Sequence, residues 1–251
     1  MSDKKRVFLL ILLLLVTVGL WLAFRGTAPQ QPRIPGMFAS SLPPGFRQVV
    51  LVLAPNDRSE TACLWLMERP EGDTWHAAAG PIPVTLGHQG LAWGKGEHTA
   101  LPPAGFRIKH EGDKCSPAGV FRLPFAFGLA AAPEATWLKL PYTPLTPSIV
   151  GVDDPKSSHY NQIVDNTQVP VDWDSNEPMQ RIGHLYEWGA FIAHNPEGTP
   201  GLGSCIFLHL WPGPGEGTAG CTAMAEDSIK QVLGWLDPVK EPRLVQGVEG
   251  W

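Results

Sequence analysis

The segment "RQVVLVLAPNDRSETACLWLMER", residues 47–69, contains two short apolar runs on either side of a polar stretch. The first run covers residues 47–54 and the second covers residues 61–69, with "PNDRSE" between them. Short runs rich in β-branched and other apolar residues, joined by turn-forming residues, are typical of a β-hairpin. The segment therefore predicts two adjacent antiparallel strands.

Short apolar runs of the same kind continue along the chain, separated by glycine and proline. We expect further strands at "GLAWGKG" (90–96), "AGVFRLPFAFG" (118–128), "WLKLPY" (137–142), "EWGAFIAHN" (187–195) and "GSCIFLHLW" (203–211). A helical period is clear only in residues 225–236, "AEDSIKQVLGWL", where five apolar residues share one face. Many short strands with one late helix predict a mainly β domain, either a sandwich or an open barrel.

The N-terminus predicts a membrane anchor over residues 1–26. Three basic residues at 4–6 precede an uncharged, largely apolar run of 18 residues from Val7 to Phe24. This run is just long enough to span a bilayer, which needs about 20 residues. No cleavage site with small residues follows Arg25, so we expect an uncleaved signal anchor with its basic end in the cytoplasm.

The remainder reads as a linker followed by one domain. Residues 27–44 contain five prolines and predict an extended linker, which leaves 45–251 as a single domain. The full chain has 19 basic and 24 acidic residues, and residues 1–30 hold four of the basic residues and one acid. The exported part therefore has 15 basic and 23 acidic residues, a net charge of −8. This charge argues against nucleic acid as a partner, because the phosphate backbone is a polyanion.

The spacing of Cys205 and His209 argues against a metal site. In a regular strand both side chains would point to one face, but four residues apart they would be separated by roughly 13 Å. A structural zinc site needs four ligands in close reach, and the chain has no C-x₂-C pair. We therefore predict no metal and no cofactor.

His209 and Cys221 have a different relationship. The intervening loop "LWPGPGEGTAG" contains four glycines and two prolines, so it can return Cys221 to the neighbourhood of His209. Gly220 would allow close approach of a reacting group, and the backbone N–H groups around it would form an oxyanion hole. We also expect the following helix to favour the thiolate of Cys221. A cysteine–histidine pair performs acyl transfer; the alternative is a packed histidine and a small buried cysteine.

The segments "GSCIFLHLW" and "GTAGCTAM" resemble the catalytic signature of the L,D-transpeptidase (YkuD-like) family, a histidine in a strand followed by a serine- or threonine-led Gly-Cys motif. The resemblance extends to "GLAWG" (90–94), "GDKCSPAGVFRL" (112–123) and "DDPKSSHYNQIV" (153–164), and it covers about residues 45–251. The chain looks like a divergent branch. Ala219 stands where the family has histidine, Ala223 stands where it has arginine or asparagine, and the His–Cys interval is shorter.

This resemblance implies a YkuD-like β-sandwich or mixed-sheet domain, with one C-terminal helix after a nucleophilic Cys221. His209 would be the base, oriented by the carbonyl of Leu210 or a nearby residue, and Thr218 and Gly220 would belong to the motif. The thiol would attack a peptidoglycan tetrapeptide stem, release D-alanine and pass the acyl group to an amine. The domain would then lie in the periplasm, anchored in a bacterial inner membrane. Alternatives are a hydrolase (an L,D-carboxypeptidase or a protein-releasing amidase) and a non-catalytic wall-binding module.

The resemblance also suggests residues that contact the substrate. His159, Tyr160 and Asn161 match one of its segments, so we expect them at the substrate, with an ordinary capped loop as the equal alternative. Three tryptophans are candidates to shape a groove, against the more common use of an aromatic in a core: Trp93, Trp173 and Trp211. For His194 we expect a structural or rim position.

The four cysteines, Cys63, Cys115, Cys205 and Cys221, leave the disulfide state open. An exported compartment permits two bridges in three pairings, or one bridge and two thiols. The resemblance brings Cys115 and Cys205 near the cleft, where we expect free thiols in preference to a bridge between them. Cys63 lies in a predicted strand, and we expect it to be buried.

Overall fold

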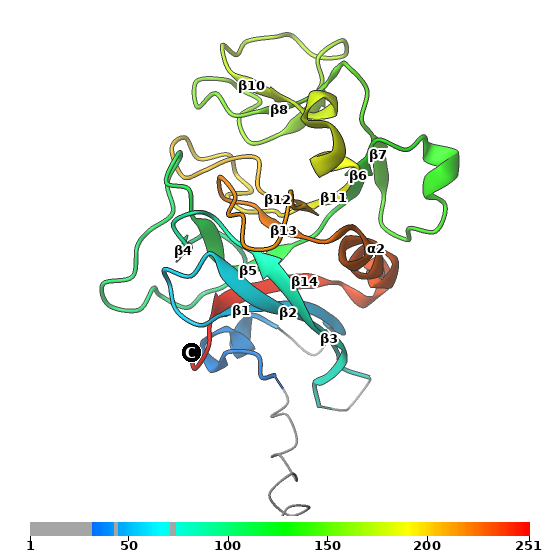
Figure 1. Ribbon diagram of the computed structural model, residues 1–251. Coiled ribbons are helices and arrows are strands. Elements are labelled where there is room, and N and C mark those ends of the chain that lie inside the picture. Colours follow the sequence, from blue (N-terminus) through cyan, green and yellow to red (C-terminus); the bar gives the residue numbers. More distant parts are fainter. Residues whose placement is uncertain (1–31, 43–44, 71–73) are drawn as a thin grey trace, which may run out of the picture. The chain divides into compact units, whose positions relative to one another are not determined.

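The structure, a computed structural model, describes residues 32–42, 45–70 and 74–251 (Figure 1). One large sheet contains β1 (Gln48–Ala54), β2 (Thr61–Glu68), β3 (His76–Thr85), β4 (Leu91–Trp93), β5 (Ser116–Arg122), β6 (Ala126–Gly128), β7 (Tyr142–Pro144), β11 (Trp188–Phe191), β12 (Phe207–Leu210), β13 (Thr222–Met224) and β14 (Arg243–Val248). A small sheet contains β8 (Ile149–Val152), β9 (Ile163–Asp165) and β10 (Asn176–Pro178). The helices are α2 (Glu226–Trp235) and the 3₁₀ segments η1 (Gly36–Ser41), η2 (Ala132–Ala135), η3 (Met179–Tyr186) and η4 (Pro238–Lys240).

The described residues form a mainly β fold, as the sequence predicts. The 11 strands of the large sheet follow the order β4-β5-β14-β1-β2-β3-β13-β12-β11-β6-β7, and the small sheet has the order β10-β8-β9. The large sheet is mixed, because β1–β14, β4–β5, β6–β7 and β12–β13 pair in parallel and its other pairs are antiparallel. The small sheet lies at the top of Figure 1, above β11, β12 and β13.

The predicted hairpin is confirmed, and its first strand lies inside the sheet. β1 and β2 pair antiparallel from Gln48↔Glu68 to Leu53↔Cys63, and β14 pairs with the other edge of β1 in parallel. All seven residues of β1 are buried. A strand covered on both faces needs apolar side chains on both faces, which explains the continuous apolar run in place of strict alternation.

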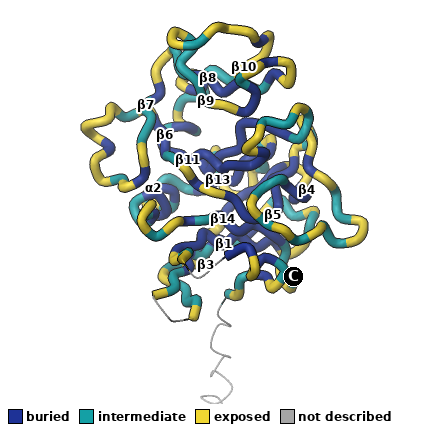
Figure 2. Tube along the Cα trace, turned by 180° about the vertical axis from the view of Figure 1, so that it is seen from behind, coloured by how far each residue is buried: buried dark blue, intermediate teal, exposed yellow. Residues whose placement is uncertain are grey.

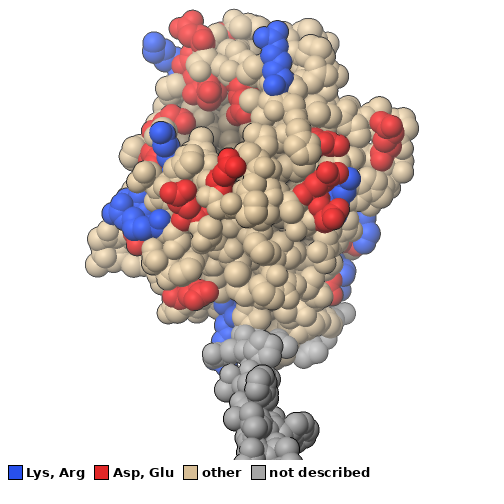
Figure 3. All heavy atoms as spheres, in the orientation of Figure 1, with Lys and Arg blue, Asp and Glu red and all other residues tan. Residues whose placement is uncertain are grey.

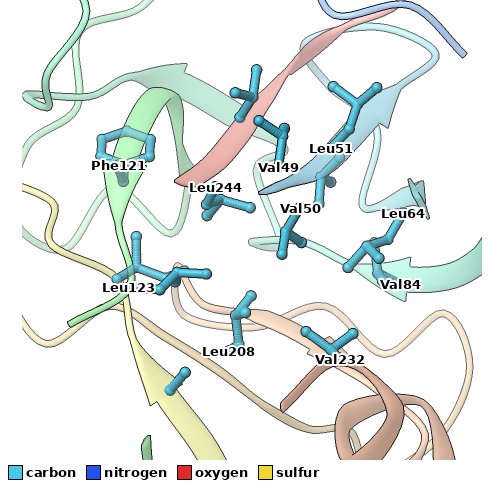
Figure 4. Close-up of a cluster of buried hydrophobic side chains, with 14 of the residues drawn as sticks. Val49, Val50, Leu51, Leu64, Val84, Phe121, Leu123, Leu208, Val232 and Leu244 are labelled. Carbon is cyan, nitrogen blue, oxygen red and sulfur yellow. The ribbon is translucent and has the colours of Figure 1, made fainter. Parts of the chain in front are cut away.

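The main core lies between the central strands and the layer made by β12 and α2. Figure 4 shows Val50 of β1 and Leu244 of β14 pointing toward Leu208 of β12 and Val232 of α2, and these four side chains are fully buried. A long twisted sheet can bring its own distant strands face to face in this way. In Figure 2 the strands of this region are dark, whereas most exposed backbone lies in the loops.

The predicted helix over 225–236 is confirmed as α2. It buries Ile229, Val232 and Leu233, the apolar stripe of the sequence pattern, and it ends before Asp237 and Pro238. Proline cannot continue a helix because it lacks the N–H and fixes its own backbone angle.

Three of the expected strands differ from the observed elements. Only Tyr142 of the expected strand 137–142 is in a strand, so that prediction is wrong; Trp137 instead packs edge-on against Trp188 at 5.1 Å between ring centres. The run 118–128 is split at Pro124 into β5 and β6, because proline has no N–H for a strand ladder. The run 203–211 becomes a strand only at Phe207, since Cys205 has a positive φ of 53°.

The compact part of the chain begins earlier than residue 45. Arg33–Trp251 form one compact unit, and η1 lies within the range expected to be linker. Phe38 of η1 is fully buried in the main core, and the Gly36 N–H donates to the Trp251 carbonyl at 3.2 Å. The expected signal anchor falls on residues outside the described ranges, and no helix within those ranges is long and apolar enough to cross a membrane.

Candidate active site

The parallel pair β12–β13 brings Cys221 back to the strand of His209. The register pairs Leu208 with Thr222 and His209 with Ala223. One step earlier, the Phe207 N–H donates to the Cys221 sulfur at 3.3 Å. Because side chains alternate along a strand, Phe207, His209 and Cys221 project to the same side of the sheet. The glycine- and proline-rich loop therefore makes the return that its composition predicts.

The ring of His209 is held by its own strand. Its Nδ1 atom lies 2.6 Å from the Leu210 carbonyl oxygen, the partner expected from the family resemblance. A carbonyl accepts only, so Nδ1 carries the proton and Nε2 is the basic nitrogen. The ring of Tyr186 packs edge-on against the imidazole at 5.3 Å between ring centres. Burial lowers the pKa of His209 to about 4, so the imidazole is neutral at pH 7.

The thiol of Cys221 is also neutral at rest. Its side chain is 8% exposed, and burial raises its pKa to about 12. The carboxylate of Glu177 adds to this rise, whereas the Phe207 N–H and the ammonium of Lys109 oppose it. The resting site therefore contains a protonated thiol and a neutral imidazole.

The backbone at Cys221 is fixed by two hydroxyl groups. Thr218 Oγ1 donates to the Cys221 carbonyl at 2.6 Å and accepts from the Gly220 N–H at 3.0 Å. Ser116 Oγ donates to the same carbonyl at 2.9 Å and accepts from the Gly87 N–H at 2.8 Å. Thr218 was expected from the motif, whereas Ser116 was not. Both hydroxyls brace the turn that presents the thiol.

Gly220 is required by space and by conformation. Its φ is +153°, and an added Cβ would lie 3.1 Å from both the Cys115 carbonyl oxygen and the Ile206 side chain. Any other residue would push into these neighbours. The glycine of the motif thus lets the chain pass closely between Cys115 and Ile206 just before the thiol.

The expected contribution of the helix to the thiolate is wrong. Cys221 is followed by β13, and α2 starts only at Glu226. A strand of this length separates the sulfur from the helix by roughly 13 Å. The field of a helix end falls off within its first turn, so α2 does not lower the pKa of Cys221.

The residues expected at the substrate have partners inside the protein. Asn161 is buried with a φ of +64°; its amide donates to the His194 and Asn195 carbonyls, each at 2.8 Å, and accepts from the Cys205 N–H at 2.9 Å. The buried Tyr160 donates its hydroxyl to Glu111. His159 is half-buried and packs edge-on against Trp173. These contacts hold the 159–161 loop in place, and Asn161 holds it against the segment that contains Cys205.

The remaining candidate residues are either buried in the protein or half-buried near its surface. Trp93 packs with Phe38 and Trp251, so its ring belongs to the core, and Trp173 is buried against His159. Trp211 is half-buried at the end of β12. His194 is buried, and its ring accepts from the Lys95 N–H at 3.2 Å and donates to the Leu202 carbonyl at 2.8 Å, the structural role expected for it. Burial lowers the pKa of His194 to about 4.

All four cysteines lie in described ranges and are free thiols. Cys63 is half-buried, so the prediction of a buried Cys63 is wrong; its strand leaves this side chain partly open to solvent. Across the described ranges, no group of three or more histidine, cysteine or acidic side chains has the spacing to hold a metal ion.

One face of the molecule is hollowed and carries acidic side chains. On the face drawn in Figure 3, a hollow lies below the small sheet and acidic side chains gather around it. Two cavities elsewhere, of about 480 and 300 Å³, are lined by other residues, including Cys115 and Arg107 in one and His98 and His194 in the other. Neither includes Cys221 or His209, so the shared face of these two residues on the β12–β13 pair, and not a cavity, identifies the candidate site.

Two residues near the thiol have no signal in the sequence. Tyr186 ends η3, and Glu177 lies in β10 of the small sheet, yet both act on Cys221 or His209. Only the fold of the small sheet brings them there.

None of the protein-family models, curated proteins or solved structures compared with this chain matches it.

Proposed function

We propose that this protein is a cell-envelope cysteine acyltransferase of the L,D-transpeptidase (YkuD-like) type that acts on peptidoglycan stem peptides. The observation that supports this most strongly is the placement of His209 and Cys221 on one face of the β12–β13 pair, with Nδ1 of His209 bound to the Leu210 carbonyl. In this proposal the fold is a YkuD-like mixed sheet, and residues 1–26 anchor it in a bacterial inner membrane with the domain in the periplasm.

The first half-reaction forms a thioester. Nε2 of His209 takes the proton from the Cys221 thiol as the sulfur attacks the carbonyl that precedes the terminal D-alanine of a tetrapeptide stem. The Cys221 backbone N–H receives the negative charge of the tetrahedral oxygen, whereas the Gly220 N–H, also expected in this role, already donates to the Thr218 hydroxyl. The intermediate collapses, the C–N bond breaks, and the imidazolium returns its proton to the amine of the leaving D-alanine.

The second half-reaction releases the acyl group. An amine of another stem attacks the thioester carbonyl and His209 accepts its proton. The C–S bond then breaks, and the imidazolium returns the proton to the sulfur of Cys221. The same site would act as a hydrolase if water replaced the amine. Ala219 and Ala223 stand where the family has substrate-contacting side chains. Without those side chains the acceptor is not specified, so the carboxypeptidase and the amidase remain alternatives.

The resting pair has the protonation states that general-base chemistry needs, a neutral imidazole and a thiol, whereas the gap between their pKa values of about 4 and about 12 opposes the proton transfer. A thiolate–imidazolium pair would need charge in a buried site, whereas a thiol and a neutral imidazole need charge only while the substrate reacts. The same high pKa of Cys221 also favours one second candidate, a wall-binding module whose thiol is inert.

Product analysis separates these candidates. The compact domain, produced as residues 30–251, and its Cys221→Ala variant are incubated with purified tetrapeptide muropeptides, and the products are identified by mass. A dimer formed with loss of D-alanine, absent with the variant, supports transfer. Loss of D-alanine without a dimer supports hydrolysis, and no change with either protein favours the binding module.

A further inference from the structure

A cavity of about 480 Å³ is formed by the turn before β4 and by the segment that leads into β5. Its lining residues are Gln89, Arg107, Ile108, His110, Asp113 and Cys115. Backbone hydrogen bonds hold one wall, because the Trp93 N–H donates to the Arg107 carbonyl at 2.6 Å and the Lys109 N–H donates to the Trp93 carbonyl at 2.9 Å. The volume lies in the range of small-molecule sites, roughly 300–1,000 Å³.

Arg107 gives this cavity a guanidinium group that is already held in place. Its Nη2 atom donates to the carbonyls of Asp57, Gln89 and Leu91 at 2.8, 2.6 and 3.0 Å. Its Nη1 atom donates to the Cys115 sulfur at 3.2 Å, and among the described residues it has no other partner. An Nη atom carries two N–H groups, so one of them remains for a ligand. A ligand that binds there pays little for ordering the side chain.

The charged groups around the cavity leave one positive charge. Lys109 and Asp113 form a buried ion pair with 2.6 Å between nitrogen and oxygen, so their charges cancel. The Asp57 carboxylate lies 3.5 Å from Arg58 Nε and 4.0 Å from Arg107 Nη2, so one acid is shared by two guanidinium groups. With histidine neutral, three basic side chains therefore face two acidic ones. This local excess occurs on a chain whose net charge is −5.

The size of this charge and the surroundings of Arg107 select a class of ligand. A single positive charge matches one carboxylate, whereas a phosphate group carries about 1.5–2 negative charges near pH 7. Carboxylate oxygens are also good acceptors for a guanidinium N–H. Ile108, which is 55% exposed, adds an apolar surface to the same cavity. These features together fit an aliphatic chain that ends in a carboxylate.

We propose that this cavity is a binding site for a ligand with a carboxylate on an aliphatic chain, in which Arg107 receives the carboxylate and Ile108 contacts the chain. The cavity adjoins the turn of the candidate nucleophile. Cys115 lines it, and the next residue, Ser116, donates its hydroxyl to the Cys221 carbonyl at 2.9 Å. The carboxylate can come from a peptidoglycan stem peptide or from a free organic acid. The first source rests on the proposed function, whereas the binding site itself does not.

The test is a titration of the ¹⁵N-labelled domain with pentanoate, followed by NMR. Backbone amide resonances of the lining residues should shift and reach saturation. Pentanamide, the neutral analogue, should bind about tenfold more weakly at the same ionic strength, because it lacks the charge that Arg107 receives.

A pair of matched variants tests the charge. Gln89→Glu adds a negative charge at an exposed lining residue and keeps the backbone carbonyl that holds Arg107, so pentanoate binding should weaken roughly fivefold or more. Gln231→Glu makes the same change at an exposed position of α2 and should match the wild type. Gln89→Glu is preferred to Arg107→Gln, because loss of the guanidinium also removes three contacts with backbone carbonyls.

Three results would overturn the proposal: no saturable shifts at the lining residues, equal binding of pentanamide, or equal affinities of the two variants for pentanoate. Competition identifies the source of the carboxylate once binding is established. Displacement of pentanoate by a tetrapeptide muropeptide supports a stem peptide as the ligand, and its failure to displace supports a free acid. If pentanoate binds as expected while muropeptides are neither bound nor converted, the proposed function fails and the carboxylate site stands.

Discussion

The Nδ1 atom of His209 lies 2.6 Å from the carbonyl oxygen of Leu210, the next residue of β12. This contact fixes the tautomer without a carboxylate partner, because a main-chain carbonyl can only accept the proton of Nδ1. A histidine oriented by a carboxylate faces a negative charge, whereas His209 faces a neutral carbonyl. A neutral acceptor does not stabilise an imidazolium as a carboxylate does, which agrees with the low pKa of His209 in its buried position.

Replacement of His209 separates its packing from its chemistry. His209→Asn can still donate an amide N–H toward the Leu210 carbonyl, but it has no basic nitrogen. We expect a folded protein whose rate of D-alanine release falls by about 10²–10⁴-fold, the usual contribution of a general base. Thermal unfolding measured beside the activity is the control. Full activity of His209→Asn would contradict the assignment of His209 as the base.

The hydroxyl of Thr218 braces the Cys221 turn, so its loss should affect both stability and activity. Thr218→Val keeps the shape but removes the donor to the Cys221 carbonyl and the acceptor for the Gly220 N–H. We expect a loss of about 1–2 kcal/mol in unfolding free energy, with lower acyl transfer. Thr218→Ser keeps the hydroxyl and should stay close to the wild type in urea unfolding. A Thr218→Ser variant as impaired as Thr218→Val would show that the methyl group, not the hydroxyl, matters.

Asn161 and His159 should respond differently to replacement. Asn161→Ala removes three buried hydrogen bonds at a positive-φ position. We therefore expect the unfolding free energy to fall by about 3 kcal/mol. His159→Ala removes one half-buried ring contact and should cost about 1 kcal/mol or less. Calorimetry compares the two variants. If Asn161→Ala keeps its unfolding temperature but loses muropeptide binding, Asn161 is a substrate ligand and not a brace.

Two buried histidines predict a loss of stability in mild acid. The pKa values of His194 and His209 are each about 4 in the folded protein, against about 6.5 in an unfolded chain. Between these values the unfolded state binds more protons, so unfolding free energy is constant above pH 6.5 and falls as the pH drops toward 4. The slope should be up to about 1.4 kcal/mol per pH unit for each histidine.

Urea unfolding at pH 7, 6, 5.5 and 5 measures this slope. His209→Asn removes one of the two titrating rings and should have a shallower profile than the wild type over the same range. Carboxyl groups titrate mostly below this window and are common to both proteins. An identical profile in the variant would mean that His209 is protonated to the same extent in the folded and unfolded states.

Local patterns predicted most of the large sheet. The β1–β2 hairpin and α2 follow from apolar runs and turn residues within a few positions of each other. The failures have local causes that the pattern does not record. Pro124 divides a run, Cys205 adopts a positive φ that delays β12, and the apolar residues of 137–142 pack from a loop. The small sheet was not predicted, because its strands have only three or four residues each.

The candidate site was predictable only in part. The glycine-rich loop and the motif identify His209, Thr218, Gly220 and Cys221, which lie within 13 positions of each other. Ser116 donates to the Cys221 carbonyl across 105 positions of the chain, and Glu177 raises the pKa of the thiol across 44; only the assembled sheets bring them there. The protonation state of Cys221 was also missed, because burial outweighs any help from the helix end.

In the proposed reaction, Cys221 attacks an acyl donor with His209 as its base. The intact mass of the domain, quenched in acid within seconds of mixing with a tetrapeptide donor in the absence of an acceptor, tests this attack. We expect an adduct equal to the donor minus D-alanine, located on Cys221 and sensitive to hydroxylamine, and absent from Cys221→Ala. A domain that binds the donor yet never gains this mass, or gains it equally without Cys221, would contradict the proposed mechanism.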